Sequence, residues 1–254
     1  MTDPSDGVPP PSDPSAPTLD AAYPRIGTPR RRKGRPLLVL ALLIFLFPIV
    51  SVLTTALIPP PVTILMLQRL AAGDGLDYRW RPLNRISPHL VASAIAAEDA
   101  RFCTHRGFDM EAIQKALDHN DAGGRVRGGS TISQQTAKNV FLWPQRSWVR
   151  KGLEAGYAVL IETIWGKRRI MEVYLNVAEM GPGVYGAEAA ARHWFGVSAS
   201  DLTPQQAARL AAVLPSPRRY KAAPPGPYVR RRAARVQANA RIVRNEGLAS
   251  CVIG

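Results

Sequence analysis

The feature that most constrains this chain is an uncharged run of 22 residues, Leu37 to Ile58, close to its N-terminus. At about 1.5 Å per residue, a helix of that length covers roughly the 30 Å hydrocarbon thickness of a bilayer. Pro48 lies inside the run and can kink such a helix, because proline lacks the backbone donor. We therefore predict one transmembrane helix over 37–58.

A cleaved signal peptide is the main alternative for this run. It would need a short basic leader, an apolar core of about 7 to 15 residues and a small-residue cleavage site. Here the leader has 36 residues, and Pro59-Pro60-Pro61 follows where cleavage would be expected. The pattern favours an uncleaved membrane anchor.

Residues 1–36 are rich in proline and poor in apolar residues, which is typical of a disordered tail. Five basic residues lie just before the span: Arg30, Arg31, Arg32, Lys33 and Arg35. The positive-inside rule keeps such a cluster in the cytoplasm, so we expect a cytoplasmic tail and an external remainder. A juxtamembrane linker over 59–84 would lead to a domain over 85–250.

The net charge of the external part limits the classes of partner that it is expected to bind. Six basic and four acidic side chains give residues 1–36 a net charge of +2, which leaves +12 of the chain's +14 for the remainder. Such a domain prefers anionic partners, and beside a membrane these are lipid head groups or phosphorylated lipids. Nucleic acid would suit the charge, but we do not expect it as a partner in that compartment.

The chain has two cysteines, Cys103 and Cys251. In an oxidising compartment these two cysteines can form a disulfide. We favour two separate thiols, and two cysteines alone do not give the spacing of a zinc site.

Helical patterns dominate from Ser87 onward. Ser87-Pro88 is a good helix start, and an apolar stripe that includes an acid follows it at helical spacing: Val91, Ala94, Ile95, Glu98 and Phe102. Four further helices are predicted, one capped by Ser130 or Thr131, two over 147–165 and 167–180, and one from Thr203. Strand signals are weak, so we expect a mainly helical domain.

Two polar clusters in this domain could carry chemistry. EDARFCTHRG begins at Glu98, whose place on the apolar stripe predicts burial and a pKa raised toward the range useful for proton transfer. A partly exposed, salt-bridged acid is the alternative. GGSTISQQTAKN joins glycines and hydroxyls to a helix N-terminus, a natural phosphate site, and Gln135 and Lys138 can reach one ligand. Ordinary capping with a solvated lysine is the alternative there.

Two further clusters follow. In RKGLE, Arg150 and Lys151 lie four and three residues before Glu154, a spacing that usually gives a surface ion-pair ladder of little energy. The functional alternative is a cationic clamp on a diphosphate. In KRRIMEVYLN, Glu172 and Asn176 are four apart, and we expect them to brace the fold.

In their order and wording, these clusters resemble the family 51 peptidoglycan glycosyltransferases, and the chain is similar to the monofunctional type over about residues 85–220. Ser133 stands where the family more often has threonine, and His193-Trp194 replaces a tyrosine-containing pair, so no catalytic role is assigned there. The resemblance implies a lysozyme-like, two-lobed helical glycosyltransferase domain, with a smaller jaw lobe near the membrane and a cleft between the lobes.

The resemblance also implies roles. Glu98 would be the general base that takes the proton from the 4-hydroxyl of the acceptor's N-acetylglucosamine. That hydroxyl would displace undecaprenyl diphosphate from the donor strand with inversion, giving a β-1,4 link. Glu154 would assist the leaving diphosphate, with Mg²⁺ or Mn²⁺ as an optional metal there and no organic cofactor. Three cations would neutralise its charge: Lys138, Arg150 and Lys151.

The other implied substrate-binding residues fall into two groups. Ser130, Thr131, Gln135 and Asn139 would lie beside the substrate. The rest of the first motif would act by shaping its loop: Asp99, Phe102 and His105.

The implied enzyme builds glycan strands from lipid II at the bacterial cytoplasmic (inner) membrane, with its catalytic domain on the periplasmic side. Its partners would be lipid II, the growing strand, membrane lipids and other cell-wall synthesis proteins. None of the six lysines has a serine three residues before it, so we expect no transpeptidase activity.

Two rival functions stay open. A lysozyme-like or lytic glycan hydrolase also uses buried glutamates in a helical domain, but it has no need of a diphosphate clamp. A catalytically silent membrane scaffold would hold partners through the basic segment Arg230–Arg244, which otherwise forms a solvated or lipid-facing surface. Such a scaffold would need neither Glu98 nor Glu154.

Overall fold

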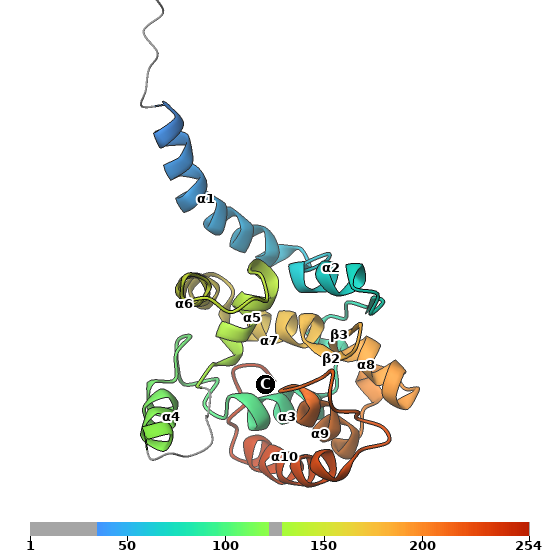
Figure 1. The fold of residues 1–254 in the computed structure, drawn as a ribbon. Coiled ribbons are helices and arrows are strands. Elements are labelled where there is room, and N and C mark those ends of the chain that lie inside the picture. The colour runs from blue at the N-terminus through green and yellow to red at the C-terminus, as the bar shows by residue number, and fades with distance from the viewer. Residues whose placement is uncertain (1–34, 122–128, 254) are drawn as a thin grey trace, which may run out of the picture. The chain divides into compact units, whose positions relative to one another are not determined.

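The computed structural model describes residues 35–121 and 129–253, and these are mainly helical, as predicted (Figure 1). Most of the predicted tail, residues 1–34, lies outside the described residues. The helices are α1 (Arg35–Leu57), α2 (Ile64–Ala71), α3 (Pro88–Glu98), α4 (Met110–Asp121), α5 (Ile132–Phe141), α6 (Trp148–Ile164), α7 (Gly166–Val177), α8 (Gly186–Phe195), α9 (Pro204–Val213) and α10 (Pro227–Asn245). Shorter elements are the strands β1 (Asp77–Tyr78), β2 (Glu179–Gly181) and β3 (Val184–Tyr185), with the 3-10 helices η2 (Leu83–Arg85) and η3 (Ala199–Asp201).

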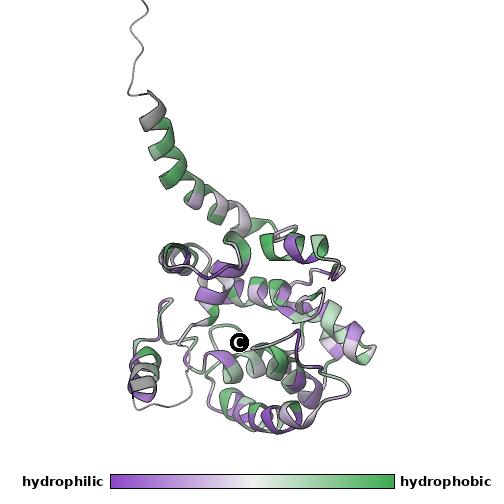
Figure 2. Cartoon of the chain, viewed as in Figure 1, coloured by the Kyte–Doolittle hydropathy of each residue, from purple (hydrophilic) through white to green (hydrophobic). Residues whose placement is uncertain are grey.

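The chain divides into two units, residues 1–41 and residues 42–254. The first unit is described only over the beginning of α1, and every contact below lies within the second. Within α1, Val39–Leu57 is long and apolar enough to span a membrane, and Figure 2 shows its first half as hydrophobic and its second half as hydrophobic with paler residues between. Almost none of the run is buried, unlike a core helix of a soluble protein.

The predicted helix starts are confirmed. At each of four helices the side-chain oxygen of the capping residue accepts a hydrogen bond from a backbone N–H of the first turn: Ser87, Thr131, Ser147 and Thr203. Gln134 and Gln206 complete capping boxes by accepting from the backbone N–H of Thr131 and Thr203. These caps satisfy donors that the first turn of a helix leaves free.

One predicted helix end is wrong, because α7 stops at Val177 and not at residue 180. Residues 179–181 instead form β2, which pairs antiparallel with β3, while β1 pairs with β3 in parallel. At Gly186, where φ is +81°, an added Cβ would lie 2.4 Å from the Asn176 carbonyl oxygen, so only glycine fits. Strands of two or three residues are too short for the alternation that a sequence pattern can detect.

The bracing role predicted for Glu172 and Asn176 is confirmed. The Asn176 side chain accepts from the backbone N–H of Arg81 and donates to the Arg81 carbonyl, each at 2.8 Å. Glu172 accepts from the backbone N–H of Leu83 at 2.8 Å. Both side chains therefore tie the segment before α3 to α7.

Residues 59–84, predicted as a linker, contribute elements to the domain. Met66 on α2 is fully buried, and α2 contacts α5. β1 adds a strand to the small sheet. The short apolar patch after the span thus packs on the domain.

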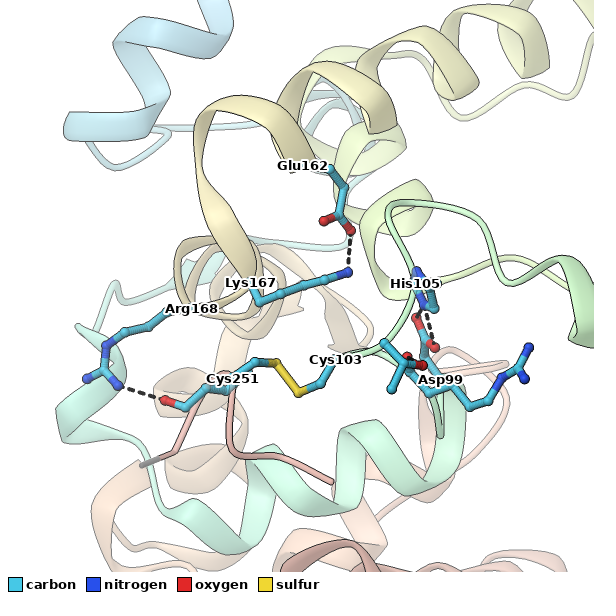
Figure 3. The surroundings of a disulfide bond; sticks show 10 residues. Asp99, Cys103, His105, Glu162, Lys167, Arg168 and Cys251 are labelled. Atoms are coloured by element: carbon cyan, nitrogen blue, oxygen red, sulfur yellow. Dashed lines mark hydrogen bonds and ion pairs between the residues drawn. A yellow bond between two sulfur atoms is a disulfide. The ribbon is translucent and has the colours of Figure 1, made fainter. Parts of the chain in front are cut away.

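Cys103 and Cys251 form a disulfide, so the expectation of two separate thiols is wrong (Figure 3). The two residues are 148 apart in sequence, and their Cα atoms lie 5.6 Å apart. No local pattern could pair them, because only the fold brings the C-terminal segment to the loop after α3.

The fold should lose stability in acid through Glu188 on α8. This fully buried carboxylate accepts hydrogen bonds from the backbone N–H of Ala199 and from two arginines, Arg81 and Arg192. Burial raises the pKa of Glu188, but these bonds outweigh it and lower the pKa from 4.5 to about 2. Since the folded value lies below the unfolded one, the stabilisation is present above about pH 4.5 and is lost as pH falls toward 2.

We therefore expect the melting temperature, followed by circular dichroism, to fall between pH 4.5 and pH 2. Glu188→Gln should lower the melting temperature at neutral pH. The melting temperature of this variant should then fall less than that of the wild type between pH 4.5 and pH 2. The exposed Glu246→Gln serves as control and should keep the wild-type slope. If the melting temperature of Glu188→Gln falls as steeply as that of the wild type, Glu188 is not the source of the acid sensitivity.

Candidate active site

Glu98 is the last residue of α3, and only 13% of its side chain is exposed. Its Oε2 accepts from Nε2 of Gln135 on α5 at 3.1 Å, and its Oε1 lies 3.3 Å from Nη2 of Arg232 on α10. Burial raises the pKa of Glu98, and the contacts with Gln135 and Arg232 oppose that rise in part. The side chain is mostly buried, as predicted, and it also forms the ion pair that the alternative expected, with Arg232. A carboxyl group with a raised pKa suits proton transfer.

Two pockets adjoin at Ser130. One, of about 250 Å³, is lined by Glu98, Asp99, Ser130 and Thr131 among others. The other, of about 300 Å³, is lined by Ser130, Gln135, Lys138, Pro144, Arg146, Arg150, Lys151 and Glu154. Gln135 also links them, since it lines the second pocket and hydrogen-bonds the acid of the first. The structure thus places both predicted acids in neighbouring pockets.

The second pocket holds an excess of positive charge. Glu154 is 3% exposed, and its Oε2 lies 2.7 Å from Nη1 of the buried Arg150. Its Oε1 pairs with Lys151, whose Nζ also lies 3.2 Å from the Ser130 hydroxyl. The Arg150–Glu154 pair is buried, so a surface ion-pair ladder does not describe RKGLE.

Lys138 completes this cationic group, together with Arg146. Burial lowers the pKa of Lys138, Glu154 opposes that shift, and the neighbouring cations add to it. Of the residues that the structure describes, four cationic side chains and one carboxylate therefore line the pocket. Such a pocket fits an anion with more than one negative charge.

The remaining residues of the first motif hold its loop. Asp99 accepts from the backbone N–H of Ile132 at 2.9 Å and lies 2.9 Å from Nε2 of His105. Phe102 is fully buried beneath the Lys167 ammonium, which lies 4.5 Å from its ring centroid. Of Asp99, Phe102 and His105, only Asp99 lines the Glu98 pocket. Asn139 is half-buried on α5 and lines neither pocket.

Sequence reasoning missed Arg232 and Arg146. The basic segment of α10 was expected to face solvent or lipid, yet Arg232 reaches the acid of α3. A signal was present, because Arg232 falls at helical spacing within the buried stripe of α10: Val229, Ala233 and Val236. An arginine on such a stripe predicts a buried acidic partner.

A model of the family described as Transglycosylase matches residues 66–241. This chain belongs to the transglycosylase family. A relative from Caulobacter vibrioides, named biosynthetic peptidoglycan transglycosylase, is 59% identical over 223 residues, which cover 88% of this chain and 97% of the relative. Proteins of the same name from Rhodospirillum centenum and Xanthomonas campestris pv. campestris (strain B100) are 59% and 55% identical, covering 77% and 83% of this chain and 85% and 89% of theirs. The resemblance drawn from the motifs is confirmed.

Proposed function

We propose that this protein polymerises the glycan strands of peptidoglycan from lipid II. The names of its relatives support this proposal. The observation that carries it is the pair of adjoining pockets, in which a buried acid with a raised pKa lies beside a cationic pocket. One pocket suits a sugar hydroxyl that must lose a proton, and the other suits a departing diphosphate.

In the proposed reaction, an oxygen of Glu98 takes the proton of the acceptor's 4-hydroxyl. The hydroxyl oxygen attacks the anomeric carbon of the donor sugar from the opposite side to the leaving group, so the configuration inverts. The bonding pair leaves with the diphosphate, where Lys138, Arg150 and Lys151 stabilise the developing charge. Glu154 orients Arg150 and Lys151 through one carboxylate oxygen each.

The donors around Glu154 do not form a resident site for a divalent cation. Both of its oxygens face cations, and among the described residues it is the only carboxylate that lines its pocket. No group of three or more histidine, cysteine, aspartate or glutamate side chains with metal-binding geometry occurs within 35–121 and 129–253. Since Mg²⁺ prefers several oxygen ligands, the described residues do not fit the Mg²⁺ or Mn²⁺ expected at Glu154, and the proposed steps use no metal.

We also propose that α1 anchors the protein in the inner membrane, with the N-terminus in the cytoplasm and the catalytic domain in the periplasm. The basic cluster before the span supports this orientation. The Cys103–Cys251 disulfide supports it independently, because such bonds persist in oxidising compartments. Lipid II, the growing strand, membrane lipids and other cell-wall synthesis proteins are the proposed partners.

Incubation of the detergent-purified full chain with lipid II tests the function. Formation of glycan polymer with release of undecaprenyl diphosphate is the expected result. The same preparation incubated with finished cell wall should release no fragments. Fragments without polymer would establish the lysozyme-like hydrolase instead, and neither product would favour the scaffold.

Arg232→Gln should move the acid limb of the pH profile of kcat to higher pH. Asp99, Tyr174 and Gln135 also face Glu98 and stay in place, so the variant removes only the cation that lowers the Glu98 pKa. A higher pKa leaves less of the basic form at a given acidic pH. The exposed Arg231→Gln on the same helix is the control, and an acid limb that does not move contradicts the role of Arg232.

A further inference from the structure

The loop between Glu98 and α4 is held at both ends by the start of α5. Near its beginning, Asp99 accepts from the backbone N–H of Ile132 at 2.9 Å. Near its end, the Gly107 carbonyl accepts from the Thr131 hydroxyl at 2.6 Å. Its middle residue, Cys103, is joined covalently to Cys251 (Figure 3).

The C-terminal segment that carries Cys251 is itself fixed on the domain. Ala249 and Val252 are both buried, and the Val252 carbonyl accepts from Nη1 of Arg168 on α7 at 2.7 Å. Lys167, the neighbour of Arg168, lies over the Phe102 ring of the loop and 2.6 Å from Glu162. The disulfide therefore connects the middle of the loop to the start of α7.

Part of the loop is closed on itself by a side-chain contact directly after Glu98, the proposed base. His105 lies 2.9 Å from the carboxylate of Asp99, which closes residues 99–105 into a ring with Cys103 inside it. The backbone N–H of Asp99 ends α3 by donating to the Ile95 carbonyl, directly after Glu98. A movement of this ring is transmitted to Glu98 through the adjoining peptide bond.

We propose that the Cys103–Cys251 disulfide is a positioning element for the base, because it holds the 99–105 ring in the arrangement that aims Glu98 into its pocket. This inference rests on the proposed function. Cys251 lies beyond the matched family region, which ends at residue 241, so a segment outside that region takes part in catalysis. The cationic group of the other pocket does not lie on the loop: Lys138, Arg150 and Lys151.

The positions of the cations predict which kinetic constant changes when the disulfide is lost. Binding of the lipid diphosphate depends on the side chains of Lys138, Arg150 and Lys151, and within the described residues none of these is bonded to the loop or to the disulfide. The rate of proton removal depends on where Glu98 points, and a misplacement of about 1 Å can cost up to about 100-fold in rate. Loss of the bond should therefore lower kcat and leave KM nearly unchanged.

The Cys103–Cys251 disulfide is accessible to a small reductant. Cys103 and Cys251 are both partly exposed, and Cys103 lines a pocket of about 730 Å³ together with Thr104, His105 and Gly166. A dithiol such as dithiothreitol attacks one sulfur through its thiolate and releases the other cysteine. Its second thiol then closes the reductant's own disulfide, so two electrons and two protons pass to the cysteines.

The experiment compares the full chain, oxidised and reduced, with Cys103→Ser, Cys251→Ser and the double variant, at a temperature where all are folded. We expect kcat for polymerisation of lipid II to fall about tenfold in each case, with KM within about twofold. The double variant should fall no further than either single one, and dithiothreitol should change only the wild type.

Two controls separate positioning from stability. Val243→Ala, buried at the far end of α10 from Arg232, should lower the melting temperature and keep the wild-type kcat. Hydrogen exchange of the backbone amides of 99–105 should speed up on reduction, whether or not the protein polymerises lipid II.

Three results would overturn the inference: wild-type kcat in the cysteine variants, a KM that rises as much as kcat falls, or unchanged amide exchange. A wild-type protein that makes no polymer would instead defeat the proposed function, and the amide exchange would still decide whether the bond holds the loop.

Discussion

Glu98→Gln should abolish polymerisation, with kcat lowered by at least about 100-fold. The amide keeps the size of the side chain but cannot accept the proton of the sugar hydroxyl. The fold should survive, because Glu98 lies at the end of α3 and the amide can keep a hydrogen bond with Gln135. The measurements are polymer formation from lipid II and a circular dichroism spectrum of the same preparation.

The matched control is Glu111→Gln on α4. That carboxylate is 52% exposed and lies outside both pockets, so its variant should polymerise at the wild-type rate. Wild-type rates in Glu98→Gln would remove the base from the proposed mechanism. A change of spectrum in Glu98→Gln alone would show that its acid supports the fold, and the assignment would then rest on the pH profile.

Features that depend on neighbours in the sequence were predicted well. The helix caps at Ser87, Thr131 and Thr203 follow from a hydroxyl and a partner two or three residues away. The burial of Glu98 follows from its place on an apolar stripe with a period of 3.6 residues. Both patterns are complete within one turn or a few turns of helix, so no knowledge of the fold is needed.

Features that depend on distant segments were missed for the same reason. The disulfide joins residues 148 apart, and Arg232 meets an acid 134 residues before it. The buried stripe of α10 predicts that Arg232 has an acidic partner, but nothing near Arg232 or the cysteines in the sequence says which distant residue each one meets. The parallel pairing of β1 with β3 likewise links the segment before α3 to the one after α7, in strands too short to alternate.

For RKGLE, the spacing predicted the contacts but not their environment. Arg150 and Lys151 both reach Glu154, as positions four and three residues before it should. Spacing on one helix says nothing about what covers it, and here Arg150 is 7% exposed. The structure therefore separates two cations that the motif treats alike, since 42% of the Lys151 side chain is exposed.

Lys151→Ala and Arg150→Ala should both lower kcat/KM by about 100-fold, since each removes a preorganised cation from the departing diphosphate. They should differ in stability. Lys151→Ala removes a half-exposed partner and should cost at most about 1 kcal/mol. Arg150→Ala removes the buried partner of Glu154 and should cost about 3 kcal/mol, because the half-exposed Lys151 compensates the buried carboxylate only in part.

Thermal melts run beside the lipid II assay measure this difference. Lys115→Ala is the control, because Lys115 pairs with Glu111 across four residues, as Arg150 does with Glu154, but on an exposed surface. This variant should change neither activity nor melting temperature measurably. A Lys151→Ala variant that melts early would mean that the cluster mainly holds α6 in place. A stable Lys151→Ala variant with weak activity, beside an unstable Arg150→Ala, assigns Lys151 to the substrate and gives Arg150 a share in both the fold and the reaction.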